Sequence, residues 1–465
     1  MVALLVCVPF FAPCRVPAQS SQLNPAAQAD TLPDIVPNNV PSPVPNGGKE
    51  KHVPVRLLGD HLPEKPTIAP SFTIPVEPLG FTAPGPYYMW QRYSMASLDF
   101  LGDDHLLFTF RVPGLIRREN GHKPGEDERQ IRAIVVDVKT GRAEAEALWT
   151  VHDYVRYLWM LKDGHFLLRD RDVLQLGDSS LVLKPLLQFP GPIEWLELDP
   201  QQLYMVTNSH EPAKVEPKPG QVDSPPTAAA IMEADGQNTS APPGPKTSAP
   251  ADTVVRILER NTGKVMLVSR FRSAVHLPIN AEGYLERLRA NGQSWLLNMK
   301  FFTGGSRILG RVESTCAPIF DFVSQSEFLV TACAGGGGTR LTAITTDGRR
   351  LWEEDATGSA IWPIIVTGPD GSRLARETIE VTHPVSASNP IDSDDVKGQL
   401  VRIINAADGS VALEAVASPA LDAGGNVAIS ATGQRVAILS AGAIQVFELS
   451  PAPQLPVLTP VPAVR

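Results

Sequence analysis

The sequence predicts an all-β protein in which a four-stranded sheet repeats seven times around a ring. Three observations lead to this prediction. A polar turn followed by a short apolar run recurs along the chain, a second hairpin follows most of these units, and the region between the proline-rich segments divides into units of about 46 residues. Up-and-down four-stranded sheets repeated radially form a β-propeller, so we expect seven blades.

The first hairpin of each unit is marked by a turn rich in Gly, Asp, Asn or Ser. The seven aligned instances are DDHLLFTF from Asp103, KDGHFLLR from Lys162, DPQQLYMV from Asp199, NGQSWLLNM from Asn291, SQSEFLVTA from Ser324, PDGSRLAR from Pro369 and TGQRVAILS from Thr432. The apolar or mixed run before each turn, such as SMASLDFL or IFDFV, would be the partner strand.

The second hairpin is clearest in four units, where a glycine occupies the turn. These glycines are Gly141, Gly263, Gly348 and Gly409. Glycine adopts positive φ without steric cost, as a tight hairpin turn requires. Two hairpins in each unit give the four strands of one blade.

The seventh unit lacks its outermost strand, because TGQRVAILSAGAIQVFELS is followed only by a proline-rich tail. A strand from the N-terminal side can fill that place and close the ring. The candidate is Ser71 to Val76, SFTIPV. The alternative is an incomplete or six-bladed ring.

The N-terminus resembles an export signal. Residues 2–12 are apolar but too short to span a bilayer, and Val16-Pro17-Ala18 has the small residues that a signal peptidase reads. We therefore expect an exported protein, periplasmic or secreted, with no transmembrane segment. The expected organisation is a signal peptide at 1–18, a Pro-rich disordered linker at 19–70, the propeller at 71–450 with a disordered insertion at 209–252, and a Pro-rich tail at 451–465.

The net charge of −9 gives no basic surplus with which to coat a phosphate backbone, so no nucleic acid partner is expected. Cleavage after Ala18 would leave two cysteines, Cys316 and Cys333. A hairpin centred on Ser324 to Glu327 brings the two cysteines near one another. An even number of cysteines in an exported chain also favours a disulfide between them. The alternative is two buried free thiols.

Two segments carry a family resemblance. TAITTDGRRLWEED and IVVDVKTGRAEAEALW resemble the quinoprotein-like (PQQ-like) repeat, in which a strand runs through a Gly turn to a Trp. The chain is also similar to WD40-like and YVTN-type seven-bladed propellers over residues 71–450. Trp149 and Trp352 match the Trp position of the repeat, whereas Val268 and Ala415 occupy it elsewhere. The resemblance implies the fold, and the departures argue against a bound quinone, so we expect no cofactor.

The long insertions predict one working face. With the strands of each blade labelled A to D from the centre outward, the insertions at 111–130, 208–252 and 381–398 and the glycine run at 335–338 all fall between strands B and C. The B-to-C and D-to-A connections lie on the same face of a propeller, so this face carries the long loops. Either the face is the binding surface, or the loops are insertions that the fold merely tolerates. On that face His152, Asp153, Tyr154, His276 and Trp362 are the candidates to contact a ligand near the central channel.

The sequence contains no catalytic or metal-binding motif of the H-E-x-x-H, G-x-S-x-G or C-x-x-C type. We therefore assign no catalytic residue and no metal ligand, and expect a binding or scaffold module for a protein, peptide or glycan. The alternative is an enzyme that uses the central channel, either a quinone-dependent oxidoreductase or a metal-assisted hydrolase or lactonase. Three or more ionisable side chains converging in the channel would favour the enzyme.

Overall fold

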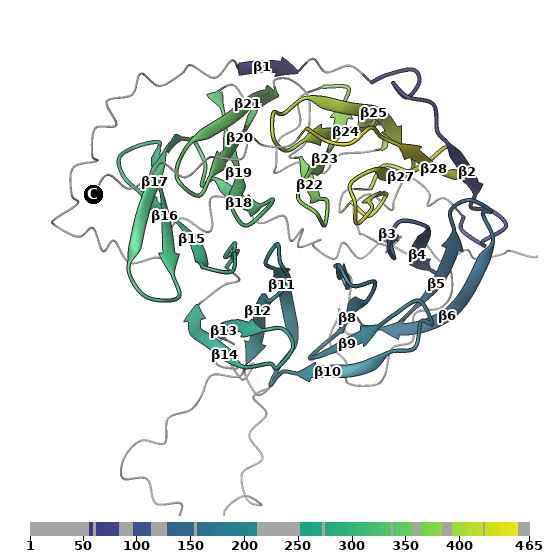
Figure 1. Ribbon diagram of the computed structural model, residues 1–465, viewed down its shortest axis with the longest axis horizontal. Coiled ribbons are helices and arrows are strands. Elements are labelled where there is room, and N and C mark those ends of the chain that lie inside the picture. The colour runs from purple at the N-terminus through teal and green to yellow at the C-terminus, as the bar shows by residue number, and fades with distance from the viewer. Residues whose placement is uncertain are drawn as a thin grey trace, which may run out of the picture.

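The computed structural model shows seven small antiparallel sheets arranged around a central axis as the blades of a β-propeller (Figure 1). The described residues are 55–58, 62–82, 96–112, 128–152, 156–211, 252–271, 275–335, 338–356, 363–383, 393–421 and 424–453. The expected signal peptide, most of the linker and of the 209–252 insertion, and residues 454–465 of the tail lie outside them. Within the described residues, no helix is long and apolar enough to cross a bilayer.

The first three blades are regular four-stranded sheets in the order A to D. Blade 1 contains β3 (Ser97–Phe100), β4 (His105–Arg111), β5 (Arg129–Asp137) and β6 (Ala143–Val151). Blade 2 contains β7 (Leu158–Met160), β8 (Phe166–Asp170), β9 (Val173–Gly177) and β10 (Lys184–Gln188). Blade 3 contains β11 (Ile193–Leu198), β12 (Tyr204–Glu211), β13 (Asp252–Glu259) and β14 (Val265–Phe271).

The remaining blades vary this plan. Blade 4 contains β15 (Gly283–Arg289), β16 (Ser294–Phe301) and β17 (Ser306–Glu313). Blade 5 contains β18 (Ile319–Phe322), β19 (Glu327–Cys333), β20 (Thr339–Thr345), β21 (Arg350–Ala356) and β1 (Val55–Leu58). Blade 6 contains β22 (Ile364–Thr367), β23 (Arg373–Val381), β24 (Val396–Asn405) and β25 (Val411–Ala417). Blade 7 contains β26 (Val427–Ile429), β27 (Arg435–Ser440), β28 (Ala443–Glu448) and β2 (Phe72–Pro75).

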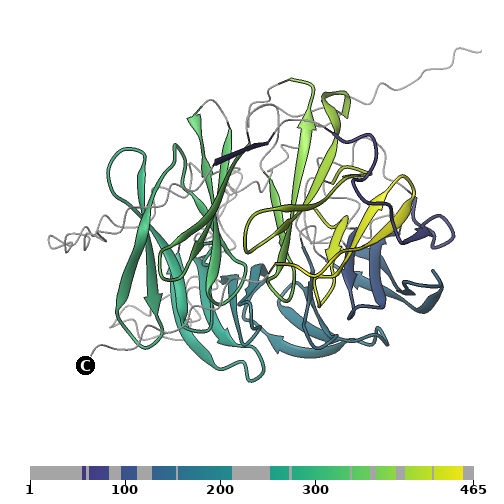
Figure 2. The same cartoon turned by 45° about the horizontal axis from the view of Figure 1, so that its top comes forward.

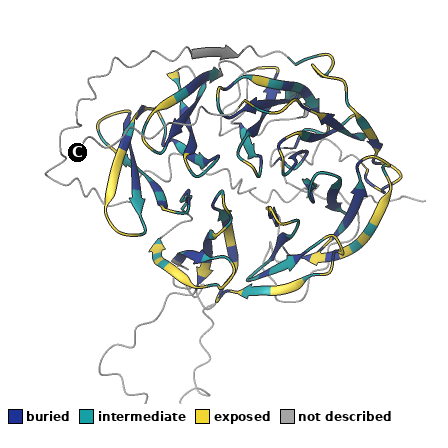
Figure 3. Cartoon of the chain, in the orientation of Figure 1, coloured by how far each residue is buried: buried dark blue, intermediate teal, exposed yellow. Residues whose placement is uncertain are grey.

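The core of the molecule lies between the blades. Each of seven clusters of buried hydrophobic residues joins two neighbouring sheets, and together they complete the circle. Strands in the middle of a blade, such as β4, are buried almost throughout, whereas outer strands such as β6 consist mostly of exposed and partly exposed residues (Figure 3). The continuous apolar runs of the sequence therefore become middle strands with neighbours on both sides.

The predicted closure of the ring is confirmed. Strand β2 pairs antiparallel with β28, with Phe72 opposite Val446 and Ile74 opposite Ile444. Ile74 is buried in the hydrophobic cluster shared by blades 7 and 1. The N-terminal strand thus supplies the outermost strand of the last blade and ties the two ends of the ring together (Figure 1).

A second N-terminal strand was not predicted. Strand β1 pairs in parallel with β21, with Val55 opposite Glu353 and Leu58 opposite Ala356. This strand lies within residues 19–70, which the composition assigns to a linker. In Figure 2 it runs along the outer edge of blade 5. Four residues carry too little periodicity to be recognised as a strand, and the pairing depends on a partner far along the chain.

Blade 4 corrects one part of the sequence alignment. The turn at Asn291 was expected to join the two innermost strands, but it joins β15 to β16 as strands B and C. The inner strand is reduced to a single bridge between Ile279 and Tyr284. Most residues of β17 are exposed, which identifies that strand as the outer one. Pro278 lacks the N–H that a longer inner strand needs, which explains the shortening.

The predicted glycine turns are confirmed, since all four glycines have positive φ between 67° and 93°. Gly409 has a further reason to be glycine, because a Cβ there would lie 2.7 Å from the Trp352 indole. That indole N–H donates to the Ala406 carbonyl at 2.6 Å, and the Trp149 indole donates to Leu181 at 3.3 Å. The Trp position of the repeat therefore joins an outer strand to the C–D turn of the next blade.

The predicted disulfide is also present. Cys316 and Cys333 are bonded with a Cα–Cα distance of 5.5 Å. Cys316 precedes β18, and Cys333 ends β19, so the bond fastens the entry of blade 5 to its second strand. The Ser314 hydroxyl accepts the N–H of Cys333 at 2.9 Å beside it. A disulfide indicates an oxidising compartment.

Candidate functional site

One face of the ring carries the long connections. The B-to-C connections β4–β5, β12–β13, β19–β20 and β23–β24 all end there, together with the D-to-A connections between blades. We call this the insertion face. The short A-to-B and C-to-D turns lie on the opposite face, which we call the turn face.

Three inner strands present an acidic side chain between two apolar ones. The segments are Leu98-Asp99-Phe100, Leu196-Glu197-Leu198 and Phe320-Asp321-Phe322. The flanking residues of β3 and β18 are buried in the clusters between blades, while Asp99 and Asp321 are only partly buried. Since side chains alternate along a strand, this pattern turns each carboxylate to the opposite face of its inner strand from these neighbours, toward the following blade.

His276 joins two of these carboxylates. It comes from the connection between β14 and β15 on the insertion face, and its Nε2 lies 2.9 Å from Glu197 Oε2 and 3.9 Å from Asp321 Oδ1. The His276 side chain is only 10% exposed. The ring of Trp195 meets His276 edge-on at 5.9 Å. Residues from blades 3, 4 and 5 therefore meet at one point.

His276 and Asp321 both have pKa values above the ordinary values of their residue types. Burial alone would lower the pKa of His276, but the carboxylates of Glu197 and Asp321 outweigh it and raise the pKa to about 9. His276 is therefore an imidazolium cation at neutral pH and cannot serve as a general base. Enclosure by the protein raises the pKa of Asp321 to about 6, although His276 opposes the shift. Asp321 keeps 33% of its side chain exposed, so solvent reaches it.

Two more groups extend the arrangement to blades 1 and 2. Arg156 precedes β7 and interacts electrostatically with both Asp99 and Glu197. Enclosure raises the pKa of Asp99, opposed by the Ser97 hydroxyl, which donates to its Oδ2 at 2.5 Å, and by Arg156. The order Asp99, Arg156, Glu197, His276, Asp321 alternates in charge over five successive blades. We call these five residues the axial arc.

His152 lies in a separate carboxylate pair. Its Nδ1 is 2.8 Å from Asp170 Oδ1 and its Nε2 is 3.6 Å from Glu128 Oε1. Both contacts are near the insertion face, at the ends of β8 and β5. The structure therefore gives each candidate histidine two carboxylate neighbours, but no described contact joins His152 to the axial arc. Asp153, Tyr154 and Trp362 lie outside the described residues.

Sequence reasoning missed Asp99, Arg156, Glu197 and Asp321. The signal that would have found three of them is an acidic residue inside an otherwise apolar inner strand, as in SLDF and IFDF. A charge at such a position is costly to bury unless a cation or a hydrogen-bond donor pairs with it. Arg156 carries no comparable local signal.

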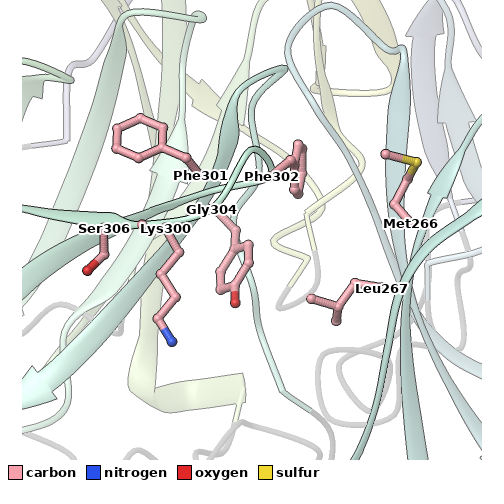
Figure 4. Close-up of a pocket in the computed structure, with 9 residues that line it drawn as sticks. Met266, Leu267, Lys300, Phe301, Phe302, Gly304 and Ser306 are labelled. Atoms are coloured by element: carbon pink, nitrogen blue, oxygen red, sulfur yellow. The ribbon is translucent and has the colours of Figure 1, made fainter.

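Two other features of the molecule carry no site. A cavity of about 450 Å³ lies between blades 3 and 4 and is lined by Met266, Leu267, Tyr284, Lys300 and Phe302 among others (Figure 4). Its lining is aromatic, aliphatic and glycine-rich apart from Lys300 and Ser306, and Lys300 pairs with Glu286 at 3.2 Å. On the turn face His105, Asp137 and Glu144 offer ligand atoms within 4.8 Å of one another. They are solvent-accessible, and such groups are common without an ion.

No family model matches the chain, and no curated protein matches it. Solved structures are similar only in overall fold. Pyrococcus horikoshii acylaminoacyl peptidase aligns at 9% identity and a TM-score of 0.42 over 75% of this chain and 50% of its own, so this chain spans about half of that protein. An uncharacterized protein from Listeria monocytogenes aligns at 8% identity with a TM-score of 0.42, covering 77% of this chain and 94% of its own. Kluyveromyces lactis Hsv2 aligns at 12% identity with a TM-score of 0.34, covering 61% of this chain and 70% of its own. These likenesses assign no activity to the chain, whose fold is that of a seven-bladed β-propeller.

Proposed function

We propose that this chain is an exported binding module that holds a protein, peptide or glycan on its insertion face. The observation that carries the proposal is that the four longest or most glycine-rich B-to-C connections leave from the same face as the D-to-A connections, one of which carries His276. Binding sites combine a shaped rim with a few convergent polar groups that fix orientation. The proposal assigns the rim to these connections and the polar groups to His276 and its two carboxylate partners.

The compartment is part of this proposal. The disulfide between Cys316 and Cys333 fits an oxidising environment. We propose export to the periplasm or the medium, with cleavage after Ala18. The intact mass of the protein from the exported fraction tests this, since a mass that includes residues 1–18 would contradict cleavage.

Two matched asparagines allow a direct test of the binding face. Asn291 is exposed in the B-to-C turn of blade 4 on the insertion face, and Asn261 is exposed in the C-to-D turn of blade 3 on the turn face. A photo-crosslinking amino acid at each position, activated in the source cells, should capture a partner from position 291 and not from 261. Capture from 261 alone, or equal capture from both, would contradict the assignment of the face.

The axial arc favours a second candidate, a hydrolase or lactonase acting on the axis of the ring. His276 lies 2.9 Å from Glu197 and 3.9 Å from Asp321, and a carboxylate with a pKa near 6 is suited to accept a proton near neutral pH. Asp321 would be that base, with the His276 imidazolium as a charge-stabilising donor. A panel of chromogenic esters and lactones, assayed with and without Ca²⁺ or Zn²⁺, tests this candidate. Turnover that Asp321→Asn abolishes would establish it, and no turnover on any substrate would dismiss it.

A further inference from the structure

On the turn face, blades 5, 6 and 7 each begin their second strand with an ionisable residue. These residues are Glu327 in β19, Arg373 in β23 and Arg435 in β27. Each follows the turn that joins strands A and B of its blade, so the three hold the same place in successive blades. Two of the three are cations, and the third is an acid.

The two arginines each connect their blade to the next one. The Nη1 of Arg373 donates to the Gly433 carbonyl in the A-to-B turn of blade 7. The Nη1 of Arg435 donates to the Asp103 carbonyl in the A-to-B turn of blade 1, at 2.8 Å. A guanidinium at this place therefore reaches the turn of the following blade twice in succession.

Glu327 makes no such connection. The residue is only 2% exposed, and its Oε1 has no hydrogen-bond partner among the described residues. Thr345, which lies opposite Glu327 on β20, donates its hydroxyl to Asp347 instead. Burial without a partner raises the pKa of Glu327 to about 8. A buried polar group without a partner is costly, so a donor brought to this carboxylate would be stabilising.

Glu327 lies at one end of a groove on the turn face. The groove has a volume of about 410 Å³ and crosses from blade 5 to blade 7, and Gly371 and Ser372 of the A-to-B turn of blade 6 also line it. Gly371 holds in its turn the place that Gly433 holds in the turn of blade 7, so its carbonyl is the counterpart of the one that Arg373 reaches. The Ser372 hydroxyl is enclosed and has no hydrogen-bond partner among the described residues. The groove thus offers acceptors where the next blade places a guanidinium.

We propose that this groove binds the guanidinium group of a ligand, which pairs with the Glu327 carboxylate and donates to the Gly371 carbonyl. The arrangement would repeat the one that Arg373 makes within the chain. A guanidinium suits the site better than an ammonium, because its planar fork presents donors to two acceptors at once. The site lies on the face opposite the insertion face and goes beyond the proposed binding function.

Binding at this site should strengthen as the pH rises. Because the pKa of Glu327 is about 8, its carboxyl group is mostly protonated at pH 7, whereas a cation pairs with the carboxylate. We therefore expect the affinity to rise by about tenfold per pH unit up to about pH 8 and then to level off. Asp370, which is exposed on the same groove, and Asp347 stay in place in every variant used for comparison, so their effects cancel.

Four small probes test the proposal on the full chain by ligand-observed NMR titration between pH 6 and pH 9. They are methylguanidinium, its neutral counterpart methylurea, methylammonium and Nα-acetyl-arginine methylamide. At pH 8 we expect methylguanidinium to bind at least about tenfold more tightly than methylurea or methylammonium, as one charge-assisted hydrogen bond allows. Tighter binding of the arginine probe than of methylguanidinium would identify a peptide side chain as the source of the group, and weaker binding would identify a free guanidino compound.

Matched variants separate a binding role from a folding role. Glu327→Gln should abolish the preference for methylguanidinium. Glu327→Arg gives blade 5 the residue type of blades 6 and 7, so it should fold and should also abolish binding, because its own guanidinium occupies the site. Glu282→Gln, at an exposed glutamate in the A-to-B turn of blade 4, should change nothing. Melting temperatures report whether each variant folds, and the Arg variant keeps the test valid if the Gln variant does not.

Equal binding of methylguanidinium and methylurea, equal binding of methylammonium, or binding of no probe would overturn the proposal. A preference that survives in Glu327→Gln would also overturn it, as would an affinity that does not change between pH 6 and pH 8. None of these results bears on the insertion face, because capture from Asn291 reports on the opposite side of the ring. Failure of that capture experiment would likewise leave the guanidinium site standing.

Discussion

His276 Nε2 and Glu197 Oε2 lie 2.9 Å apart, and this contact ties the entry of blade 4 to the inner strand of blade 3. Blade 4 has only a single bridge in place of its inner strand. The ion pair therefore holds the axis of the ring where backbone pairing is weakest. This position makes His276 a sensitive reporter of both charge and fold.

Removing the Glu197 charge should lower the pKa of His276. We expect Glu197→Gln to bring it from about 9 back toward the ordinary value of 6.5, because burial then acts with less opposition. Titration of the histidine Cε1 signals by NMR measures this. The matched control is Glu194→Gln, whose partner is His210 at 3.0 Å and which should leave His276 unchanged. A His276 pKa that stays near 9 would contradict the assigned cause.

The same pair predicts a pH dependence of stability. Because the folded pKa of His276 is raised above 6.5, its stabilising effect is complete below pH 6.5 and is lost as the pH rises through about 9. Burial also raises the pKa of Glu327 and of Glu377 to about 8, which adds a dependence of the same sign. Urea unfolding of wild type and His276→Gln isolates the histidine: their difference in unfolding free energy should shrink between pH 6 and pH 9.5. A constant difference would be the contrary result.

The buried ion pair between blades 5 and 6 should be costly to break on one side only. Arg376 and Glu354 are each 1% exposed and in direct contact. We expect Glu354→Ala to lower the free energy of unfolding by about 3–5 kcal/mol, because it leaves a buried guanidinium without its charge partner. Adding Arg376→Met should recover most of that loss. Equilibrium denaturation of the two variants checks this, and a double variant no more stable than the single one would contradict it.

The disulfide should contribute about 3 kcal/mol, since it closes a loop between cysteines 17 residues apart. We expect Cys316→Ser with Cys333→Ser to lower the free energy of unfolding by that amount. A reductant should have the same effect on wild type and none on the double variant. Unfolding curves with and without reductant make the comparison, and a reductant effect on the double variant would point to another cause.

Closure of the ring by β2 predicts unequal effects of two truncations. A chain that begins at residue 62 keeps β2, whereas one that begins at 81 loses the strand and the buried side chains of Ile74 and Val76. Those two side chains alone are worth at least about 3 kcal/mol. Thermal melting should therefore place the shorter chain clearly below the longer one. Identical melting would reject the closure.

Local patterns in the sequence predict much of this architecture. The apolar runs and the glycine turns, such as Gly141 and Gly409, identify strands because alternation and positive φ are properties of neighbouring residues. The same reasoning locates SFTIPV as the missing strand. It fails at Asn291, because a turn between strands B and C looks the same in sequence as one between A and B. It also fails at β1, where four residues give too little pattern.

The sequence by itself predicted the all-β class, the seven-fold repeat, the closing strand and the pairing of Cys316 with Cys333 from local periodicity, turn chemistry and a count, and the structure chose each of them over its alternative. Only the tertiary structure decided which side chains meet at the axis. Glu197, His276 and Asp321 come from three successive blades, and their charges depend on distances that no local pattern contains. Burial and Coulomb interactions act through space, so the raised pKa values of His276 and Asp321 appear only once the ring has closed.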